Sequence, residues 1–194
     1  VSGSKNTIGK SVDGGKTFTW INPKVVENRD FRDIEVISKN NYLALGIDSP
    51  AYILNTKDGG KSWSKVYENA EKGIFLDALY IDYKSKTITA LGDPIVEGQP
   101  FVLKSTTTIP DKWEVVKSLN GEALRLKNPK EAFFASSGSN LYVDAKQTLI
   151  ISGGELSNLY RYKSKTGQLY TLEKTKSSTS GINGLAYDPV NNVG

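Results

Sequence analysis

Four carboxylate residues have the chemistry and the local setting of a catalytic site: Asp33, Asp77, Asp93 and Glu131. Each lies within or beside a short apolar segment, as in FRDIEV, FLDALYI, ALGDPI and EAFF. Two carboxyl groups roughly 5 to 9.5 Å apart can hydrolyse a glycosidic bond, one as general acid and the other as nucleophile or base. Neither role requires histidine. These four residues are therefore the candidate catalytic groups of the chain.

The amino-acid composition removes several other kinds of site. The chain of 194 residues contains no His, no Cys and no Met. Without His there is no Ser–His–Asp or Cys–His catalysis, and the commonest transition-metal ligand is missing. Without Cys there is no disulfide and no Cys-based zinc site, and no loop has the carboxylate spacing of an EF-hand. We expect no metal and no cofactor, and the missing Met indicates that Val1 is not the natural start.

The charge pattern favours neither nucleic acid nor membrane as a partner. Lys and Arg number 25 against 21 Asp and Glu, a net charge of +4, but the lysines are scattered and form no long basic run. No apolar run approaches about 18 residues, the length that a transmembrane helix needs. We expect a solvated, lysine-rich surface, no nucleic-acid partner and no transmembrane segment.

A turn motif occurs twice in the sequence, as SVDGGKTF at 11–18 and as TKDGGKSW at 56–63. Asp accepts hydrogen bonds from nearby backbone amides, Gly supplies a positive φ, and the flanking Thr and aromatic residues favour strands. Each copy therefore predicts the tip of a β-hairpin, tied by Asp13 or Asp58, with Phe18 or Trp63 packed into a core. The positions assigned to this Asp-box are Ser11, Asp13, Gly15, Thr17, Phe18, Thr56, Asp58, Gly60, Ser62 and Trp63.

Nucleotide-binding loops do not fit the same letters. A phosphate-binding loop has a glycine five residues before its Gly-Lys glycine, and a helix begins directly after the loop. At the position of that first glycine, the two copies in this chain have Lys10 and Asn55. No G-x-G-x-x-G follows a strand into a helix either. The sequence therefore contains no motif for a phosphate or a dinucleotide.

The motif belongs to a longer repeat. Related segments close on Trp113 and Tyr170, so that the closing aromatic residues recur at intervals of about 50 residues. Short strand-like segments fill each interval, and no convincing helical periodicity occurs. We predict an all-β propeller of four-stranded blades. The expected units are a blade remainder at 1–27, blades at 28–72, 73–121 and 122–176, and the start of another blade at 177–194.

Six segments in order carry a resemblance to a known family: DFRDIEV, IFLDALYI, ALGDPI, EAFFASSGSN, IISGG and SSTSGINGLAY. With the Asp-boxes, they resemble the bacterial Asp-box (BNR) propellers of the photosystem II stability/assembly factor-like group. Members of that family are often labelled oxidoreductase or glycosyl hydrolase. The resemblance implies a seven-bladed propeller, exported to the periplasm or outside the cell, of which this chain would form about four blades.

In a propeller the innermost strands line a central channel, so their polar residues are the candidate ligand-binding groups. These are Arg32, Asp33, Asp77, Glu131 and Ser137, with Asp93 expected at the same rim. Two interpretations stay open. The residues could form a channel binding site, or they could be structural, for example as an Arg32–Asp33 ion pair or a carboxylate that caps a turn.

The function expected from these observations is a non-catalytic binding or assembly-factor-like scaffold. It would hold a protein partner or a glycan at one propeller face. The alternative is a carbohydrate-active hydrolase of the sialidase or glycosidase kind that uses the channel carboxylates. Sialidases clamp their substrate with three arginines, whereas this chain has four Arg in all, only one of them on an innermost strand.

Overall fold

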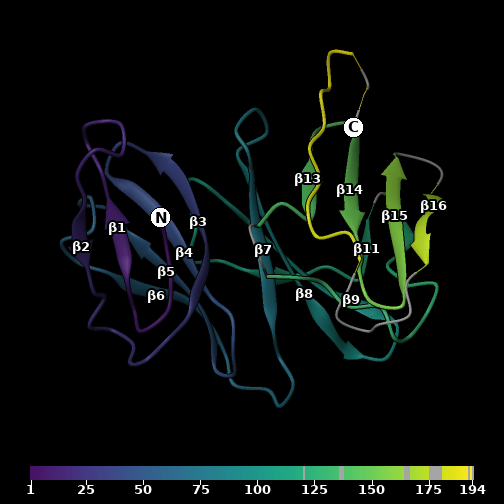
Figure 1. Ribbon diagram of the computed structural model, residues 1–194, viewed down its shortest axis with the longest axis horizontal. Helices are drawn as coiled ribbons and strands as arrows, with labels where there is room; N and C mark the ends of the chain where they lie inside the picture. The colour runs from purple at the N-terminus through teal and green to yellow at the C-terminus, as the bar shows by residue number, and fades with distance from the viewer. Residues whose placement is uncertain (120, 136–137, 164–166, 175–180, 192, 194) are drawn as a thin grey trace.

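A computed structural model describes all residues except 120, 136–137, 164–166, 175–180, 192 and 194. Every regular element of the described residues is a β-strand (Figure 1). The first four-stranded sheet contains β3 (Phe31–Ser38), β4 (Asn41–Gly46), β5 (Ala51–Thr56) and β6 (Ser64–Asn69). The second contains β7 (Leu76–Asp82), β8 (Thr87–Val96), β9 (Gln99–Thr106) and β10 (Glu114–Val115). The third contains β13 (Leu141–Val143), β14 (Gln147–Ile151), β15 (Leu156–Lys163) and β16 (Gly167–Lys174).

Two small hairpins accompany these sheets. One pairs β1 (Ile8–Lys10) with β2 (Thr19–Ile21), and the other pairs β11 (Ser118–Leu119) with β12 (Glu122–Ala123). In all three large sheets the strands lie in the order of the chain and every pair is antiparallel. Each sheet is therefore a simple meander, which confirms the prediction of an all-β chain built from four-stranded units.

The core lies between successive sheets, not within one central cluster. In β4, Ala44 packs toward the β1–β2 hairpin, whereas Leu43 and Leu45 pack toward the second sheet. In β8, Ala90 faces the first sheet and Leu91 faces the third. Because alternate side chains of a strand point to opposite faces, the central strands need apolar residues at consecutive positions. This is why NYLALG and TITALG read as nearly continuous apolar runs.

The innermost strands of the three sheets lie side by side, β3 beside β7 and β7 beside β13. Figure 1 shows the β1–β2 hairpin and the third sheet at opposite ends of the long axis, with the second sheet between them. This is a propeller-like arrangement of successive blades. One expected strand differs: among its described residues, the segment 131–143 forms an isolated bridge at Ala132 and the short strand β13. Gly138, with a φ of 66°, cannot continue an extended strand between them.

Both Asp-box turns carry the hydrogen bonds that the turn interpretation requires. The amide of Gly15 donates to Ser11 Oγ (2.8 Å), and the amide and hydroxyl of Thr17 donate to the two oxygens of Asp13 (3.0 and 2.6 Å). These bonds lower the pKa of Asp13 to about 2, and the bond from the Thr17 hydroxyl has the largest effect. The second box repeats the three bonds at 2.9, 2.9 and 2.5 Å with Thr56, Asp58, Gly60 and Ser62.

The closing aromatic residues of the two boxes differ in their packing. Trp63 is half-buried against the core cluster of the first sheet, and its indole nitrogen donates to Gly60 O (3.2 Å). Phe18 is 39% exposed and stacks on the exposed Trp20 with ring centroids 5.7 Å apart. The prediction that Phe18 packs into a core is therefore wrong. Its side of the β1–β2 hairpin faces away from the first sheet, and no other described sheet covers it.

The second Asp-box turn also packs against the preceding hairpin. Gly60 has a φ of 95°, and a Cβ atom there would lie 2.6 Å from Ile21 Cδ1. Gly15, at the same position of the first box, has a φ of 87° but nothing within 4 Å of such a Cβ. The second turn therefore joins two structural units, whereas the first turn is free on its outer side among the described residues.

This difference predicts the outcome of a matched pair of substitutions. Gly15→Ala should lower the free energy of unfolding by about 1 kcal/mol, the strain of a left-handed alanine. Gly60→Ala should cost about 1.5–3 kcal/mol, because the Ile21 Cδ1 methyl, at the end of a flexible side chain, must move aside in addition to the same strain. Urea denaturation of both variants measures the difference. Equal losses would contradict the contact between the second turn and Ile21.

Candidate functional site

Asp33 connects the first sheet to the second. It lies on β3 and is 8% exposed, and its Oδ2 accepts the amide of Leu79 on β7 (2.6 Å). Its Oδ1 accepts the neighbouring amide of Ile34 (2.7 Å). Burial raises the pKa of Asp33 to about 6, and the two amide bonds oppose that rise. Both carboxylate oxygens are thus engaged by backbone groups in this structure.

Asp93 has a similar role between the second and third sheets, although it lies on β8 and not on the innermost strand. Its Oδ1 accepts the amide of Phe133 (2.8 Å), a buried residue of the core cluster that fills this junction. Burial raises the pKa of Asp93. Asp33 and Asp93 therefore each offer a carboxylate to a backbone amide of the next unit along the chain.

Asp77 is the one candidate whose carboxylate is not satisfied. Its side chain on β7 is 0% exposed, and neither oxygen has a hydrogen-bond partner among the described residues. Burial is the main cause that raises its pKa well above the ordinary value, and the charge of Asp93 adds to it. The amide of Asp93 opposes the rise slightly, but its own hydrogen bond goes to Phe75 O (3.0 Å).

A β-bulge explains why Asp33 and Asp77 are not equivalent, although the sequence aligns them. In the first sheet Phe31 pairs with Gly46 and Asp33 with Leu45, which leaves Arg32 as the extra residue. In the second sheet Leu76 pairs with Gly92 and Ala78 with Leu91, which leaves Asp77 as the extra residue. A bulge changes the direction in which the side chain of the extra residue points. The residue equivalent to Asp77 is therefore Arg32 and not Asp33.

Arg32 therefore stands at the position of Asp77. It is exposed and pairs with Asp30, at 3.2 Å between Nη2 and Oδ2. The structural interpretation that paired Arg32 with Asp33 is corrected by this contact, because the bulge points the guanidinium away from the buried carboxylate.

Glu131 forms the centre of a buried hydrogen-bond network. It is 3% exposed; Oε1 accepts the amide of Asn128 (2.8 Å), and Oε2 accepts the hydroxyl of Tyr160 (2.7 Å) and that of Ser152. The Tyr160 oxygen in turn accepts the amide of Lys127 (2.8 Å). Burial, more than the carboxylate, raises the pKa of Tyr160. The network anchors the loop before the third sheet to β14 and β15.

Of the four candidates, Asp77 and Asp93 lie close enough for their charges to interact. Asp33 and Glu131 each accept hydrogen bonds elsewhere, from backbone amides and, for Glu131, from hydroxyl groups. Ser137 lies outside the described residues. Three cavities of the described part of the chain, of about 260, 380 and 790 Å³, are lined by other residues than the four candidate carboxylates. One acid was missed: Glu35 on β3, whose pKa burial raises to about 7, with a contribution from Asp33. Its position within the strand-like segment FRDIEVIS could have indicated from the sequence that this acid is partly buried.

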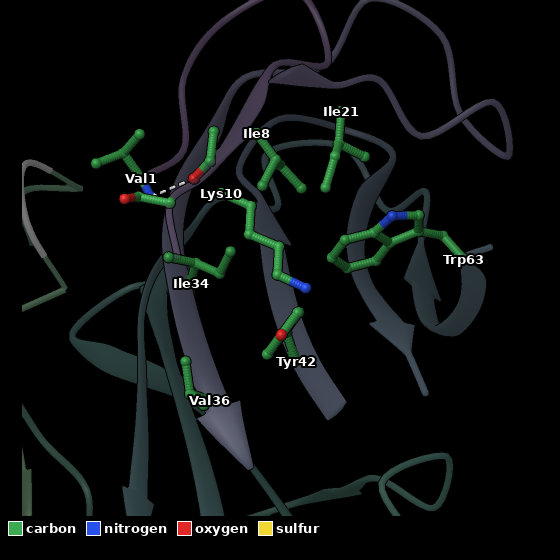
Figure 2. A pocket seen from close by; sticks show the side chains of 10 residues that line it. Val1, Ile8, Lys10, Ile21, Ile34, Val36, Tyr42 and Trp63 are labelled. Atoms are coloured by element: carbon green, nitrogen blue, oxygen red, sulfur yellow. Dashed lines mark hydrogen bonds between the residues drawn. The ribbon is translucent and has the colours of Figure 1, made fainter. Parts of the chain in front are cut away.

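A cavity of about 260 Å³ lies between the β1–β2 hairpin and the first sheet (Figure 2). Its walls are mostly aliphatic, with the Trp63 ring on one side. Lys10 enters it, with Nζ 5.4 Å from the centre of the Tyr42 ring and 3.1 Å from Gly59 O. The cavity is an incompletely filled space between two units, and its lining includes one basic side chain, Lys10, and no carboxylate.

A larger cleft, of about 790 Å³, lies beside the turns that follow β7 and β13. Tyr142 stands at its inner side, packed between Tyr80 (5.4 Å between ring centroids) and Tyr187 (4.9 Å). The cleft is also lined by four cations and two carboxylates, which are Lys84, Lys146, Arg161, Lys163, Asp82 and Asp144. The sequence alone does not indicate this site, because its residues come from segments that are far apart in the chain.

In the part of the chain that the structure describes, no group of three or more Asp or Glu side chains is arranged to hold a metal ion. No helix among them has the length and hydropathy needed to cross a membrane.

Comparison with known proteins gives a distant similarity of fold. No protein-family model matches the chain, and no curated protein matches it. Twelve chains of solved structures show similarity. One of them, described as YCF48 bound to D1 peptide, has a TM-score of 0.38 and 16% sequence identity. The alignment covers 84% of this chain and 60% of that one, so this chain spans less than two thirds of its length.

Proposed function

We propose that this chain is part of a non-catalytic β-propeller scaffold that holds a partner protein at one face of the ring. The observation that carries the proposal is the use made of the buried carboxylates. Asp33, Asp93 and Glu131 accept hydrogen bonds from amides and hydroxyls that join neighbouring strands and sheets. Carboxylates used in this way stabilise the junctions, and they are not presented to a substrate.

The wider architecture is part of the same proposal. The Asp-box turns and the meander sheets support a ring of such blades, and the sequence resemblance supports seven of them, with this chain forming about four. An exported bacterial protein is the setting that the resemblance favours. The unit boundaries at 28, 73, 122 and 177 are proposed on the same basis.

A carbohydrate-active hydrolase is the second candidate, and the pair Asp77 and Asp93 is the observation in its favour. The unsatisfied Asp77 carboxylate beside a second acid resembles the paired carboxylates of glycosidases. Asp77 is fully buried, however, and a substrate would need an opening to reach it. The scaffold is therefore the better-supported function.

An experiment that separates the two uses the purified chain, a peptide array and a set of chromogenic glycosides. The scaffold proposal expects saturable binding to a subset of peptides and no turnover of any glycoside above the no-protein control. Glycoside turnover that Asp77→Asn abolishes, in a variant that stays folded, would overturn the scaffold in favour of the hydrolase.

A further inference from the structure

We propose that the 790 Å³ cleft binds an extended acidic segment of the partner protein. The inference rests on the proposed scaffold function and adds the place and the chemistry of its partner. It depends on three features of the cleft: lysines that form no ion pair with a described carboxylate, acids that are already hydrogen-bonded, and an aromatic inner wall.

Three lysines of the cleft are available to a ligand. Lys84 and Lys146 are exposed, Lys163 is half-buried, and none of the three forms an ion pair with a described carboxylate. Arg161 is held in place, since its Nε donates to Gln147 Oε1 (2.6 Å). The inference therefore rests on the three lysines, and Arg161 contributes its charge to the wall of the cleft.

The two carboxylates of the cleft bond to neutral groups of their own turns and form no ion pair with the three lysines. Asp82 Oδ1 accepts the amide of Lys84 (3.0 Å). Asp144 Oδ1 accepts the amides of Lys146 (2.7 Å) and Gln147 (2.9 Å), while its Oδ2 accepts the hydroxyl of Tyr142 (3.0 Å). Both acids thus shape the turns that carry the lysines. Four cations against two acids leave the cleft with an excess of positive charge.

The aromatic wall determines which anion fits best. Tyr142 and Tyr187 line the cleft, and Tyr80 continues the same row of rings toward the second sheet. Rings of this kind give a ligand's aliphatic or peptide groups a surface on which to pack. A chain that combines carboxylates with apolar side chains uses both the cations and the rings, whereas a bare polyphosphate uses only the cations.

The test measures binding of defined peptides to the intact chain by fluorescence anisotropy. The probe is a fluorescein-labelled peptide of about ten residues in which Glu alternates with Leu, so that an extended backbone places every carboxylate on one side. Matched peptides replace Glu by Gln or by Lys. We expect binding of the Glu peptide only, weakened at least about tenfold when salt rises from about 0.05 to 0.3 M.

A charge-reversal pair locates the site. The double variant Lys146→Glu with Lys163→Glu should lower the affinity for the Glu peptide at least about tenfold. The control, Lys24→Glu with Lys57→Glu, changes the net charge equally at exposed positions outside the cleft and should change affinity by less than about threefold. Circular dichroism verifies that both double variants keep their sheets.

The outcomes separate this inference from the scaffold function. Equal losses in the two double variants would overturn the cleft as the site. Tighter binding of a single-stranded oligonucleotide than of the Glu peptide would overturn the acidic protein segment as its ligand. If array peptides bind but the Glu peptide does not, this inference fails and the scaffold function stands; if no peptide of any composition binds, both fail.

Discussion

Replacing Asp77 by Asn is expected to raise the thermal unfolding midpoint at about pH 8 by roughly 5 °C or more. The carboxylate is fully buried without a hydrogen-bond partner among the described residues, and Asp93 lies close enough to disfavour its charge. An amide of nearly the same size carries no charge at any pH. The variant therefore avoids the cost of burying a carboxylate, and also the cost of keeping Asp77 protonated at a pH where the unfolded chain would release the proton. Differential scanning calorimetry measures the shift.

The sign of the pH dependence follows from the direction of the pKa shift. The pKa of Asp77 in the folded state lies well above its ordinary value of 3.8. The stability linked to this proton is fully present below about pH 4 and is lost as the pH rises through the folded-state pKa. Asp33, with a pKa raised to about 6, contributes in the same direction between about pH 4 and pH 6.

The wild-type chain should therefore lose part of its stability between about pH 5 and pH 8, and the D77N variant should lose less. Asp48→Asn is the matched control, because Asp48 is exposed and should leave the profile unchanged. A D77N variant that is destabilised equally at both pH values would show that the carboxylate is a required acceptor in the native state.

Replacing Glu131 by Ala is expected to lower the free energy of unfolding by roughly 3 kcal/mol or more. The substitution leaves the amide of Asn128 and the hydroxyls of Ser152 and Tyr160 without their acceptor in a buried setting. Each buried donor without a partner costs about 1–3 kcal/mol. Urea denaturation at about pH 7 measures the change.

Two further variants identify the network as the cause of that loss. Tyr160→Phe removes one hydroxyl from it and should cost about 1–2 kcal/mol. Glu155→Ala removes an acid of the same type that forms an exposed ion pair with Lys130 (3.4 Å), and it should cost less than about 0.5 kcal/mol. A loss at Glu131 no larger than that at Glu155 would contradict the network.

Local features of this fold could be predicted from local sequence. The Asp-box turns are encoded within eight residues, because Asp13 and Asp58 bond to amides only four positions on. The meander sheets follow from short apolar segments separated by turns. Sequence spacing is sufficient wherever the interacting atoms belong to the same hairpin.

Features that depend on register or on neighbouring units could not be predicted in this way. The bulges that separate the roles of Asp33 and Asp77 leave no mark in the motif, since both residues follow an aromatic residue within two positions. Whether Phe18 is covered depends on the sheet beside it. The cleft joins Lys84, Lys146 and Lys163 from three turns and strands, and only the assembled sheets bring them together.

The order of the sheets has a consequence for how the chain folds as it is synthesised. Each core cluster is completed by the unit that comes next in the sequence: the first by β4 and β5, the second by β7 to β9, and the third by β13 to β15. Contacts that are local along the chain favour fast folding and need little search among distant segments. A growing chain that has just released β9 from the ribosome can already bury the junction between its first two sheets. Each later unit then adds to a surface that is already formed.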